Sequence, residues 1–200
     1  MIGEPAYFAQ HKCTPLPAWQ ALLAQWQLPT DVADVAIAAQ CAPSLAEGVY
    51  CLRGRASLDK ISAIGRPVLL RLRDGDAETW AVLLGSDAVR ARLRLGNDII
   101  DTDRVTLQHA WNGEYAALWR AAPGLTMPLL PEGDAAATTW VRERLAAHPT
   151  TDGSVAPGLS EEVRRFQAAH GLLADAVIGP ETLFALAAND PGPRLLRTLD

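Results

Sequence analysis

The sequence predicts an α+β fold in which helices come first and an antiparallel sheet follows, with a small three-helix unit at the C-terminal end. Apolar residues first recur at helical spacing, then alternate with charged residues along several short segments, and finally return to helical spacing. A segment rich in proline and glycine, APGLTMPLLPEGDAA, separates the last two regions. We therefore expect a first domain over residues 1–122, a linker over residues 123–134 and a second domain over residues 135–200.

Two amphipathic helices and a shorter third helix are expected in the first part of the chain. PLPAWQALLAQWQLP carries apolar residues at positions i, i+3, i+4 and i+7 from Trp19, and DVADVAIAAQ repeats this spacing from Val32. SLDKISAIG forms the third helix. Ser57 is its expected N-cap, because a serine oxygen accepts a hydrogen bond from the first helical turn, and Gly65 is its expected end.

The antiparallel sheet is predicted from alternating segments in the middle of the chain. PVLLRLRD and TWAVLLGSD flank the turn GDAE and form a hairpin, and VRARLRLG continues the sheet. EYAALW is a further strand, after a short helical turn around Gln108. We expect NDIIDTD to be a solvated turn, since it lacks the glycine and the glutamate that a calcium-binding EF-hand loop requires.

Three helices are predicted in the C-terminal part. The first covers residues 139–147, the second extends from Ser160 as its N-cap to Gly171, and the third begins at Pro180, a residue type favoured in the first helical turn, and ends near Ala188. Four apolar residues are spaced to fill one small core: Phe166, Leu172, Ile178 and Leu183.

Composition excludes two classes of partner. The net charge of −5 and the lack of a basic stripe argue against a nucleic-acid-binding protein. No apolar stretch of the sequence reaches the roughly 18 residues that a membrane span requires, and MIGEPAYFAQHKC lacks the apolar core of a signal peptide. The four histidines are scattered and the sequence has no CxxC pair, so neither a metal site nor a cofactor is expected. The protein is then either cytoplasmic or part of a longer exported or membrane-anchored chain.

The three cysteines allow at most one intrachain disulfide. Cys41 and Cys51 close a short loop, CAPSLAEGVYC, and a bridge between them would imply an oxidising compartment. Composition alone favours two buried, inert thiols instead. In either case Cys13 is left over.

The C-terminal helices resemble the peptidoglycan-binding domain family, the three-helix modules found beside cell-wall hydrolases. The resemblance extends from about Trp140 to Leu186 and rests on the order VRRFQAAHGLLADAVIGPETLFAL. The family usually has Asp-Gly where this chain has Asp175 followed by Ala176. The positions that match the family pattern are Val163, Phe166, Gln167, Gly171, Leu172, Asp175, Val177, Gly179 and Thr182.

This resemblance implies that the unit binds peptidoglycan in a groove beside its second and third helices. Arginine side chains can bind the carboxylates of wall stem peptides through forked hydrogen bonds, although charged helix surfaces are also common where no ligand binds. Some modules of the family serve only as spacers or protein-contact surfaces. The expected binding residues are Arg164, Arg165, Gln167, Asp175 and Thr182.

The first part resembles the periplasmic region of the general secretion pathway protein A family. The segments that carry the resemblance are CAPSLAEGVYCLRGRASLDKISAIGRPVLLRL, TWAVLLG and WNGEYAALWRA. It implies a papain-like, cysteine-peptidase-type first domain followed by a peptidoglycan-binding domain. In that family the region lies in the periplasm, after a cytoplasmic ATPase and one membrane helix, so this chain would be a fragment. With a periplasmic address, a disulfide between Cys41 and Cys51 is expected.

The family pattern also predicts that the peptidase-like domain is inactive. Active relatives have a histidine at the start of the strand TWAVLLG, where this chain has Thr79 and Trp80, and neither side chain is a general base at neutral pH. The acid that orients the histidine would fall near Gly96 and Asn97. Cys13 lies close to the nucleophile position. We expect no catalytic residue in the chain.

The two resemblances together imply a non-enzymatic periplasmic module that binds peptidoglycan and a protein partner. Such a module would help to assemble the secretin of the type II secretion system through the cell wall, with the companion general secretion protein B as its partner. It would reach the membrane only through N-terminal segments that this chain lacks. The alternative is a cell-wall or peptide-cleaving cysteine hydrolase, targeted by its peptidoglycan-binding module, with His11 or His109 as its base. A further alternative is a module that has lost wall binding and serves only assembly.

Overall fold

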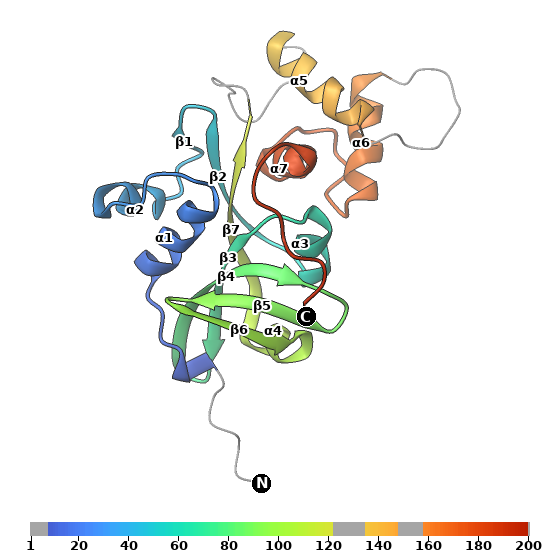
Figure 1. Ribbon diagram of the computed structural model, residues 1–200. Coiled ribbons are helices and arrows are strands. Elements are labelled where there is room, and N and C mark those ends of the chain that lie inside the picture. The colour runs from blue at the N-terminus through green and yellow to red at the C-terminus, as the bar shows by residue number, and fades with distance from the viewer. Residues whose placement is uncertain (1–7, 122–134, 148–157, 200) are drawn as a thin grey trace.

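A computed structural model of the chain describes residues 8–121, 135–147 and 158–199 (Figure 1). Its central element is a seven-stranded sheet with the order β1-β2-β7-β3-β4-β5-β6, in which neighbouring strands are antiparallel. The strands are β1 (Ser44–Ala46), β2 (Val49–Arg55), β3 (Val68–Asp74), β4 (Ala77–Ser86), β5 (Arg90–Leu95), β6 (Asp98–Asp103) and β7 (Trp111–Arg120). The predicted α+β class is confirmed.

Helices cover both faces of this sheet. In Figure 1, α1 and α2 lie on one side of the strands, and α3 and α7 lie on the other. The helical elements are η1 (Phe8–Gln10), α1 (Pro15–Gln25), α2 (Val32–Ala38), α3 (Leu58–Ile64), α4 (Arg104–Ala110), α5 (Ala135–Ala146), α6 (Leu159–Ala169), α7 (Pro180–Leu186) and η2 (Ala187–Asn189). The sequence thus places a C-terminal helix directly against the sheet that the middle of the chain forms.

Local sequence signals determine several of these elements. The Ser57 hydroxyl accepts a hydrogen bond from the Lys60 N–H at 3.2 Å, and Gly65 ends α3 with a φ of +73°, as predicted. The hairpin of β3 and β4 turns through Gly75, and Pro180 begins α7. In α2 the buried face is formed by Val35 and Ala38, whereas the first residue of the helix is exposed.

Three strands lie where the sequence predicted no strand. The loop that ends in Cys51 forms the hairpin of β1 and β2. The first four residues of β2 are all buried, so they show no alternation between apolar and polar residues. The segment NDIIDTD is the strand β6 rather than a solvated turn, because its carboxylates have local partners. Both oxygens of Asp101 accept hydrogen bonds at 2.7 Å from Arg92 on β5, and Asp103 caps α4 by accepting from the Thr106 N–H at 2.8 Å.

Of the three predicted C-terminal helices, the first two form with shifted starts. Ser160 is not the N-cap of α6, because the N–H groups of Glu161 and Glu162 already bond to the Gly158 carbonyl at 2.9 and 3.2 Å. Helix α5 begins at Ala135, earlier than residue 139, and the Thr139 hydroxyl donates to the Ala135 carbonyl at 2.8 Å. The expected linker over residues 123–134 lies outside the described residues. Of the four expected core residues, three are buried and one is partly buried: Phe166, Ile178 and Leu183, and Leu172, respectively.

The last described segment, residues 187–199, returns to the sheet. The Leu196 N–H donates to the Leu84 carbonyl at 3.0 Å, and its carbonyl accepts from the Ser86 N–H at 2.9 Å, so Leu196 forms a parallel bridge with Gly85. A Cβ at Gly85 would lie 2.8 Å from the Leu196 Cβ, so only glycine allows this approach. Leu195 and Leu199 are buried beside it. The segment around Leu196 therefore pairs with β4 at Gly85, just beyond the part of β4 that pairs with β3.

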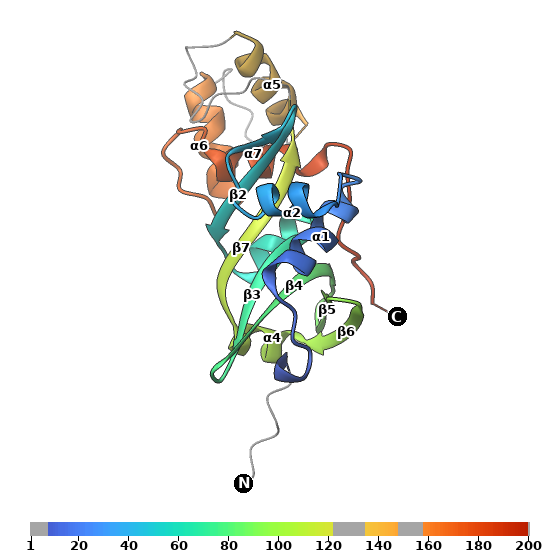
Figure 2. The ribbon, with the colours of Figure 1, turned by 90° about the vertical axis from the view of Figure 1, so that its left-hand side faces the viewer.

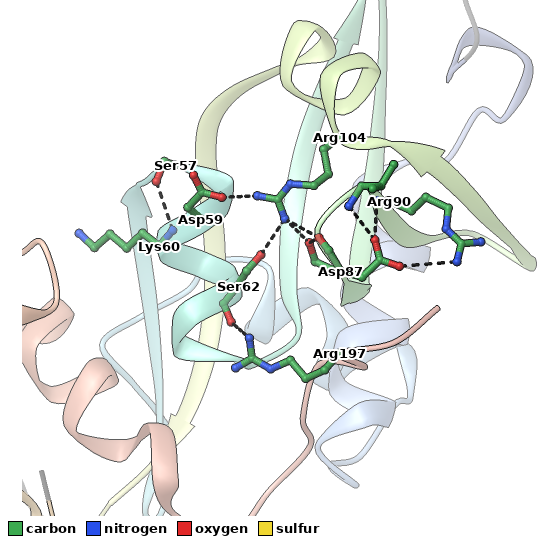
Figure 3. A network of polar contacts seen from close by, with 10 residues as sticks. Ser57, Asp59, Lys60, Ser62, Asp87, Arg90, Arg104 and Arg197 are labelled. Carbon is green, nitrogen blue, oxygen red and sulfur yellow. Dashed lines mark hydrogen bonds and ion pairs between the residues drawn. The ribbon is translucent and has the colours of Figure 1, made fainter. Parts of the chain in front are cut away.

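Arginine side chains fix this returning segment. Arg66 is 2% exposed and donates to the carbonyls of Ala187 at 3.0 Å, Pro193 at 2.9 Å and Asp190. Burial lowers the pKa of Arg66 to about 10, so the guanidinium stays charged at neutral pH. Figure 3 shows a second contact, in which Arg197 donates to the Ser62 carbonyl of α3.

Aromatic contacts also connect the C-terminal helices with the sheet. The ring of Trp119 on β7 lies 6.3 Å from Trp140 on α5, and Tyr115 lies 6.4 Å from Phe184 on α7. The buried apolar residues of both parts belong to one contiguous cluster. The division at residue 122 stays a prediction, and the two parts pack through a shared core.

Candidate functional site

The start of α1 and the start of β4 meet at Cys13. Cys13 is buried and lies two residues before Pro15, the first residue of α1. Its N–H donates to the Thr79 hydroxyl oxygen at 2.9 Å, and its carbonyl accepts from the Trp80 N–H at 3.0 Å. The Thr79 hydroxyl in turn donates to the His11 carbonyl at 2.8 Å. The structure therefore brings together the three residues that the family pattern placed at the nucleophile and histidine positions.

The Cys13 thiol lies in surroundings that oppose ionisation. Burial raises the pKa of the Cys13 thiol, and a hydrogen bond from the Gly96 backbone offsets only part of this rise. The Cys13 Sγ lies 3.5 Å from the Thr14 carbonyl. An activated cysteine has the opposite property, a pKa lowered by a nearby cation or imidazolium. The thiol is therefore protonated at neutral pH.

Neither histidine considered as a base bonds to this thiol among the described residues. The His11 Nδ1 lies 3.3 Å from the Asp98 Oδ2, and His109 is exposed on α4. An open groove of about 860 Å³ adjoins Cys13, and Gly96 and Asn97 are among the residues that line it. The residues at the position of the orienting acid therefore do lie beside the thiol, but neither of them carries a carboxylate.

The predicted disulfide between Cys41 and Cys51 is present, with 5.2 Å between the two Cα atoms. It connects the segment after α2 with the third residue of β2. Cys13 is the remaining free cysteine. The bridge fixes the hairpin of β1 and β2 to the helical layer that covers this face of the sheet.

In the C-terminal helices, Gln167 organises the loop between α6 and α7. Gln167 is 1% exposed, and its Nε2 donates to the Val177 carbonyl at 2.9 Å, the Thr182 hydroxyl at 3.2 Å and the Asp175 Oδ1 at 3.2 Å. Its Oε1 accepts from the Ala176 N–H at 2.9 Å. Ala176 has a φ of +66°, a conformation that costs a non-glycine residue about 1–2 kcal/mol. This explains why the family usually has glycine there, and the Gln167 contacts hold the loop in spite of that cost.

Arg164 and Arg165 lie on the outer surface of α6. Both contact the same carboxylate, Glu161, at 3.8 and 3.2 Å. Arg164 is exposed and Arg165 is half-buried, so one acidic group faces two cations. The five predicted binding residues thus divide into two groups. Gln167 and Thr182 are buried in the loop network with the exposed Asp175 at its edge, while the two arginines face solvent.

Two kinds of feature are absent from the described residues. No group of histidine, cysteine, aspartate or glutamate side chains in the described ranges could hold a metal ion. Within the same ranges, every helix is too short or too polar to cross a bilayer.

Family models match both parts of the chain. Residues 8–121, which include the Cys13 centre and the whole sheet, match the family model described as GspA, peptidase C39-like domain. The chain belongs to this family. Residues 135–186 match the model of a peptidoglycan binding domain. The order of a GspA C39-like domain followed by a peptidoglycan-binding domain was the one expected from the sequence.

Two curated relatives have the same family name. The general secretion pathway protein A of Aeromonas hydrophila is 29% identical over 188 residues, which cover 90% of this chain and 34% of that protein. The protein of this name in Escherichia coli (strain K12) is 26% identical over 152 residues, which cover 74% of this chain and 31% of that protein. The chain therefore spans about a third of the length of the curated relatives that it matches.

A solved structure shares the fold over nearly the whole chain. It is a periplasmic domain of the EpsAB fusion protein of the Vibrio vulnificus type II secretion system. The TM-score is 0.57 and the identity is 21%, with 99% of this chain and 97% of that chain covered. The GspA C39-like sheet and the C-terminal helices thus occur together in a known fold.

Three features of the GspA C39-like chain were not found from the sequence. These are the buried Arg66, the network around Gln167, and a row of arginines on β2 and β3. Arg66 and Gln167 carry a weak signal, since each polar residue lies within a largely apolar neighbourhood in the sequence. The arginine row depends on which strands are adjacent, and the sequence alone did not give the strand order.

Proposed function

We propose that this chain is a non-enzymatic, periplasmic part of a type II secretion system protein that binds peptidoglycan and a companion protein. The hydrogen bond of the Cys13 N–H with Thr79 carries the proposal, because it puts a hydroxyl where a cysteine peptidase needs an imidazole. The raised pKa of the Cys13 thiol supports the same conclusion. The disulfide of Cys41 and Cys51 supports an oxidising compartment.

The companion protein is the general secretion protein B of the same pathway. The solved relative is a fusion named EpsAB, which supports a close association of components A and B. A chain that binds both the wall and this partner would help to place the secretin through the cell wall. The peptidase-like part then serves as the protein-contact domain, and the peptidoglycan-binding part serves as the wall anchor.

The wall-binding surface in this proposal is the outer face of α6 and the loop that follows it. Arg164 and Arg165 contact stem-peptide carboxylates, since together they carry one positive charge more than Glu161 neutralises. Gln167 and Thr182 are buried under the loop and hold its backbone in place, and Asp175 lies at its exposed edge.

Co-sedimentation of the chain with purified peptidoglycan sacculi tests wall binding. We expect the chain to pellet with sacculi at low salt and to be released as the salt concentration rises, since exposed charges are screened. The double variant Arg164→Ala and Arg165→Ala should pellet less, while Arg142→Ala on the exposed surface of α5 should pellet like the unchanged chain. A folded chain that stays in the supernatant at low salt would contradict the wall-binding role.

The second candidate is a cysteine hydrolase, and one observation favours it. An open groove of about 860 Å³ adjoins a cysteine at the start of a helix. A hydrolase would release soluble fragments from sacculi or cleave peptides, and Cys13→Ala would abolish that release. We expect no release by either protein. Turnover that disappears in Cys13→Ala would establish the hydrolase instead.

A further inference from the structure

A second groove lies on the face of the sheet that carries α1. Figure 2 looks onto this face, with α1 and α2 in front of the sheet and β2, β7 and β3 passing beside them. The groove has a volume of about 440 Å³ and is lined by side chains of four adjacent strands. These are Arg53 and Arg55 of β2, Glu114 of β7, Leu69 and Arg71 of β3, and Trp80 of β4.

Strand register orders these side chains into two rows. Arg55 is paired with Glu114 and Arg71 with Trp80, which gives one polar and aromatic row across the strands. Residues 53, 116 and 69 form the next row, and both Ala116 and Leu69 are buried. The groove therefore has a small apolar floor, with Arg53 and Arg55 at its β2 end and Arg71 beside Trp80 toward its β4 end.

The charges in the groove are not balanced. Glu114 is shared by Arg55 at 3.0 Å and Arg71 at 4.0 Å, and Arg71 also contacts Glu78 at 2.5 Å. Arg53 donates to the Ala39 carbonyl at 2.7 Å and has no carboxylate partner among the described residues. With Glu78 counted, three arginines thus face two carboxylates, which leaves one positive charge in excess at the groove of a chain whose net charge is −5.

Arg71 carries a separate indication of a missing partner. Its Nε atom is buried and has no hydrogen-bond partner in the described part of the chain. A buried donor without a protein partner costs free energy, and an acceptor on an occupant of the groove would complete its contacts. The Arg71 guanidinium also lies 6.0 Å from the Trp80 ring, which holds it at the groove.

The dimensions define what the groove can hold. Four strands are separated by three spacings of about 4.8 Å, so the lining side chains span about 14 Å. An extended chain advances about 3.4 Å per residue, so this span takes about four residues that run across the strands. The β2 end of this span meets Arg53 and Arg55, and Arg71 lies two strands away on β3, beside Trp80 of β4. This arrangement favours a segment in which two acid groups flank apolar side chains that meet Leu69 and Ala116.

We propose that this groove binds an acidic, extended segment of a protein partner. The assignment to a protein rests on the proposed function, in which the C39-like part is the protein-contact domain. The position of the groove also supports a protein partner. The groove adjoins the peptidase-like centre, because the Trp80 N–H bonds to the Cys13 carbonyl, whereas the arginines of α6 belong to the wall-binding part. The apolar floor takes side chains that wall sugars do not carry.

Titration of the whole chain with a blocked peptide, acetyl-Glu-Leu-Leu-Glu-amide, tests the proposal. Calorimetry measures the affinity, and the Trp80 indole N–H resonance, assigned by its loss in Trp80→Phe, reports the location. We expect binding that weakens with salt and a shift of this resonance. The matched peptide acetyl-Gln-Leu-Leu-Gln-amide should bind at least about tenfold more weakly, because it lacks the charged contacts.

Two substitutions should change the affinity in opposite directions. Arg71→Gln removes a cation and should weaken binding about fivefold or more, whereas Glu114→Gln removes the carboxylate of the groove and should strengthen it about threefold. Misfolding cannot produce both effects. Arg142→Ala on α5 is the control and should leave the affinity unchanged. Equal binding of the two peptides, or weaker binding by Glu114→Gln, would overturn the proposal.

The wall assay separates this inference from the proposed function. Arg71→Gln should pellet with sacculi like the unchanged chain, because the groove is not the wall site. If Arg71→Gln loses sedimentation, the occupant of the groove is a wall stem peptide and the proposal of a protein segment is wrong. If the unchanged chain fails to sediment but binds the acidic peptide, the wall-binding role is contradicted and the proposal that the groove binds an acidic protein segment is supported.

Discussion

Single residues decide whether the C39-like centre can work. Cys13 lies beside the position that the family histidine would occupy, but the contact there is a backbone hydrogen bond to the Thr79 hydroxyl. The sequence predicts that Thr79 and Trp80 stand where active relatives have the histidine, and the structure shows that both residues bond to Cys13. The sequence was not sufficient to predict that Cys13 contacts both of them, since these residues are 66 and 67 positions apart in the chain and only the fold brings them together.

The pH dependence of Cys13 alkylation follows from its burial. Burial raises the pKa of the thiol above its ordinary value, so the reactive thiolate is scarce at neutral pH and its fraction increases as the pH rises toward this raised pKa. We expect slow reaction with iodoacetamide at pH 6–8, measured by mass spectrometry under native conditions, and a steep increase above that range. Rapid alkylation at pH 6 would show that a base activates the thiol.

Gln167 should matter for stability more than its polar character suggests. Gln167→Leu replaces the amide with an apolar side chain of similar size, and leaves the Ala176 N–H and the Val177 carbonyl without their partner. We expect the free energy of unfolding to fall by about 2–4 kcal/mol in urea denaturation. Arg164→Ala, on the same helix, should change it by less than about 0.5 kcal/mol. Equal effects of the two substitutions would refute the supporting role of Gln167.

At the scale of elements, the sequence predicted what local signals determine. Helices α1, α3 and α7 were placed correctly because caps and apolar spacing act within a few residues. The strands β1, β2 and β6 were missed. The first four residues of β2 are buried without alternation, and the carboxylates of β6 are stabilised by Arg92 and by the start of α4. Such contacts depend on neighbouring elements, which the local pattern does not contain.

The disulfide is an element-scale connection with a measurable effect. We expect alkylation of the denatured, non-reduced protein to label one cysteine, Cys13, and alkylation after reduction to label all three. Reduction of the bridge, which closes a loop of ten residues' separation, should lower the free energy of unfolding by about 3 kcal/mol. Three labels without reduction, in protein made in an oxidising compartment, would contradict the bridge and weaken the periplasmic assignment.

At the scale of the whole molecule, the two family-matched parts are held together by more than their covalent connection. Arg66 bonds to three carbonyls of the returning segment, and Leu196 forms backbone hydrogen bonds with Leu84 and Ser86 of β4. In Figure 3, Arg104 links α3 with the loop after β4, and Arg197 adds the chain end to the same α3. The sequence predicted two separate units, because the contacts between them involve residues about 120 positions apart, such as Arg66 with Ala187.

Gly85→Ala tests this connection. A Cβ at Gly85 would lie 2.8 Å from both Leu196 and Leu199, so the returning segment must shift away from β4. We expect the Leu196 amide to exchange with deuterium at least about tenfold faster, measured by hydrogen exchange and mass spectrometry. Gly158→Ala meets no atom within 4 Å and should leave this exchange unchanged. Unchanged protection in Gly85→Ala would mean that the segment is not fixed on the sheet.

The returning segment also determines how the molecule bears mechanical load. If the C-terminal helices are fixed to the wall, a pull on them reaches the sheet at Gly85 and at the buried guanidinium of Arg66. Leu196 runs alongside β4, so the load along the strand is shared by the hydrogen bonds on both sides of that residue and does not open them one at a time. A pull on the wall would therefore be transmitted to the domain that carries the groove of β2, β7, β3 and β4, with little stretch between that domain and the C-terminal helices.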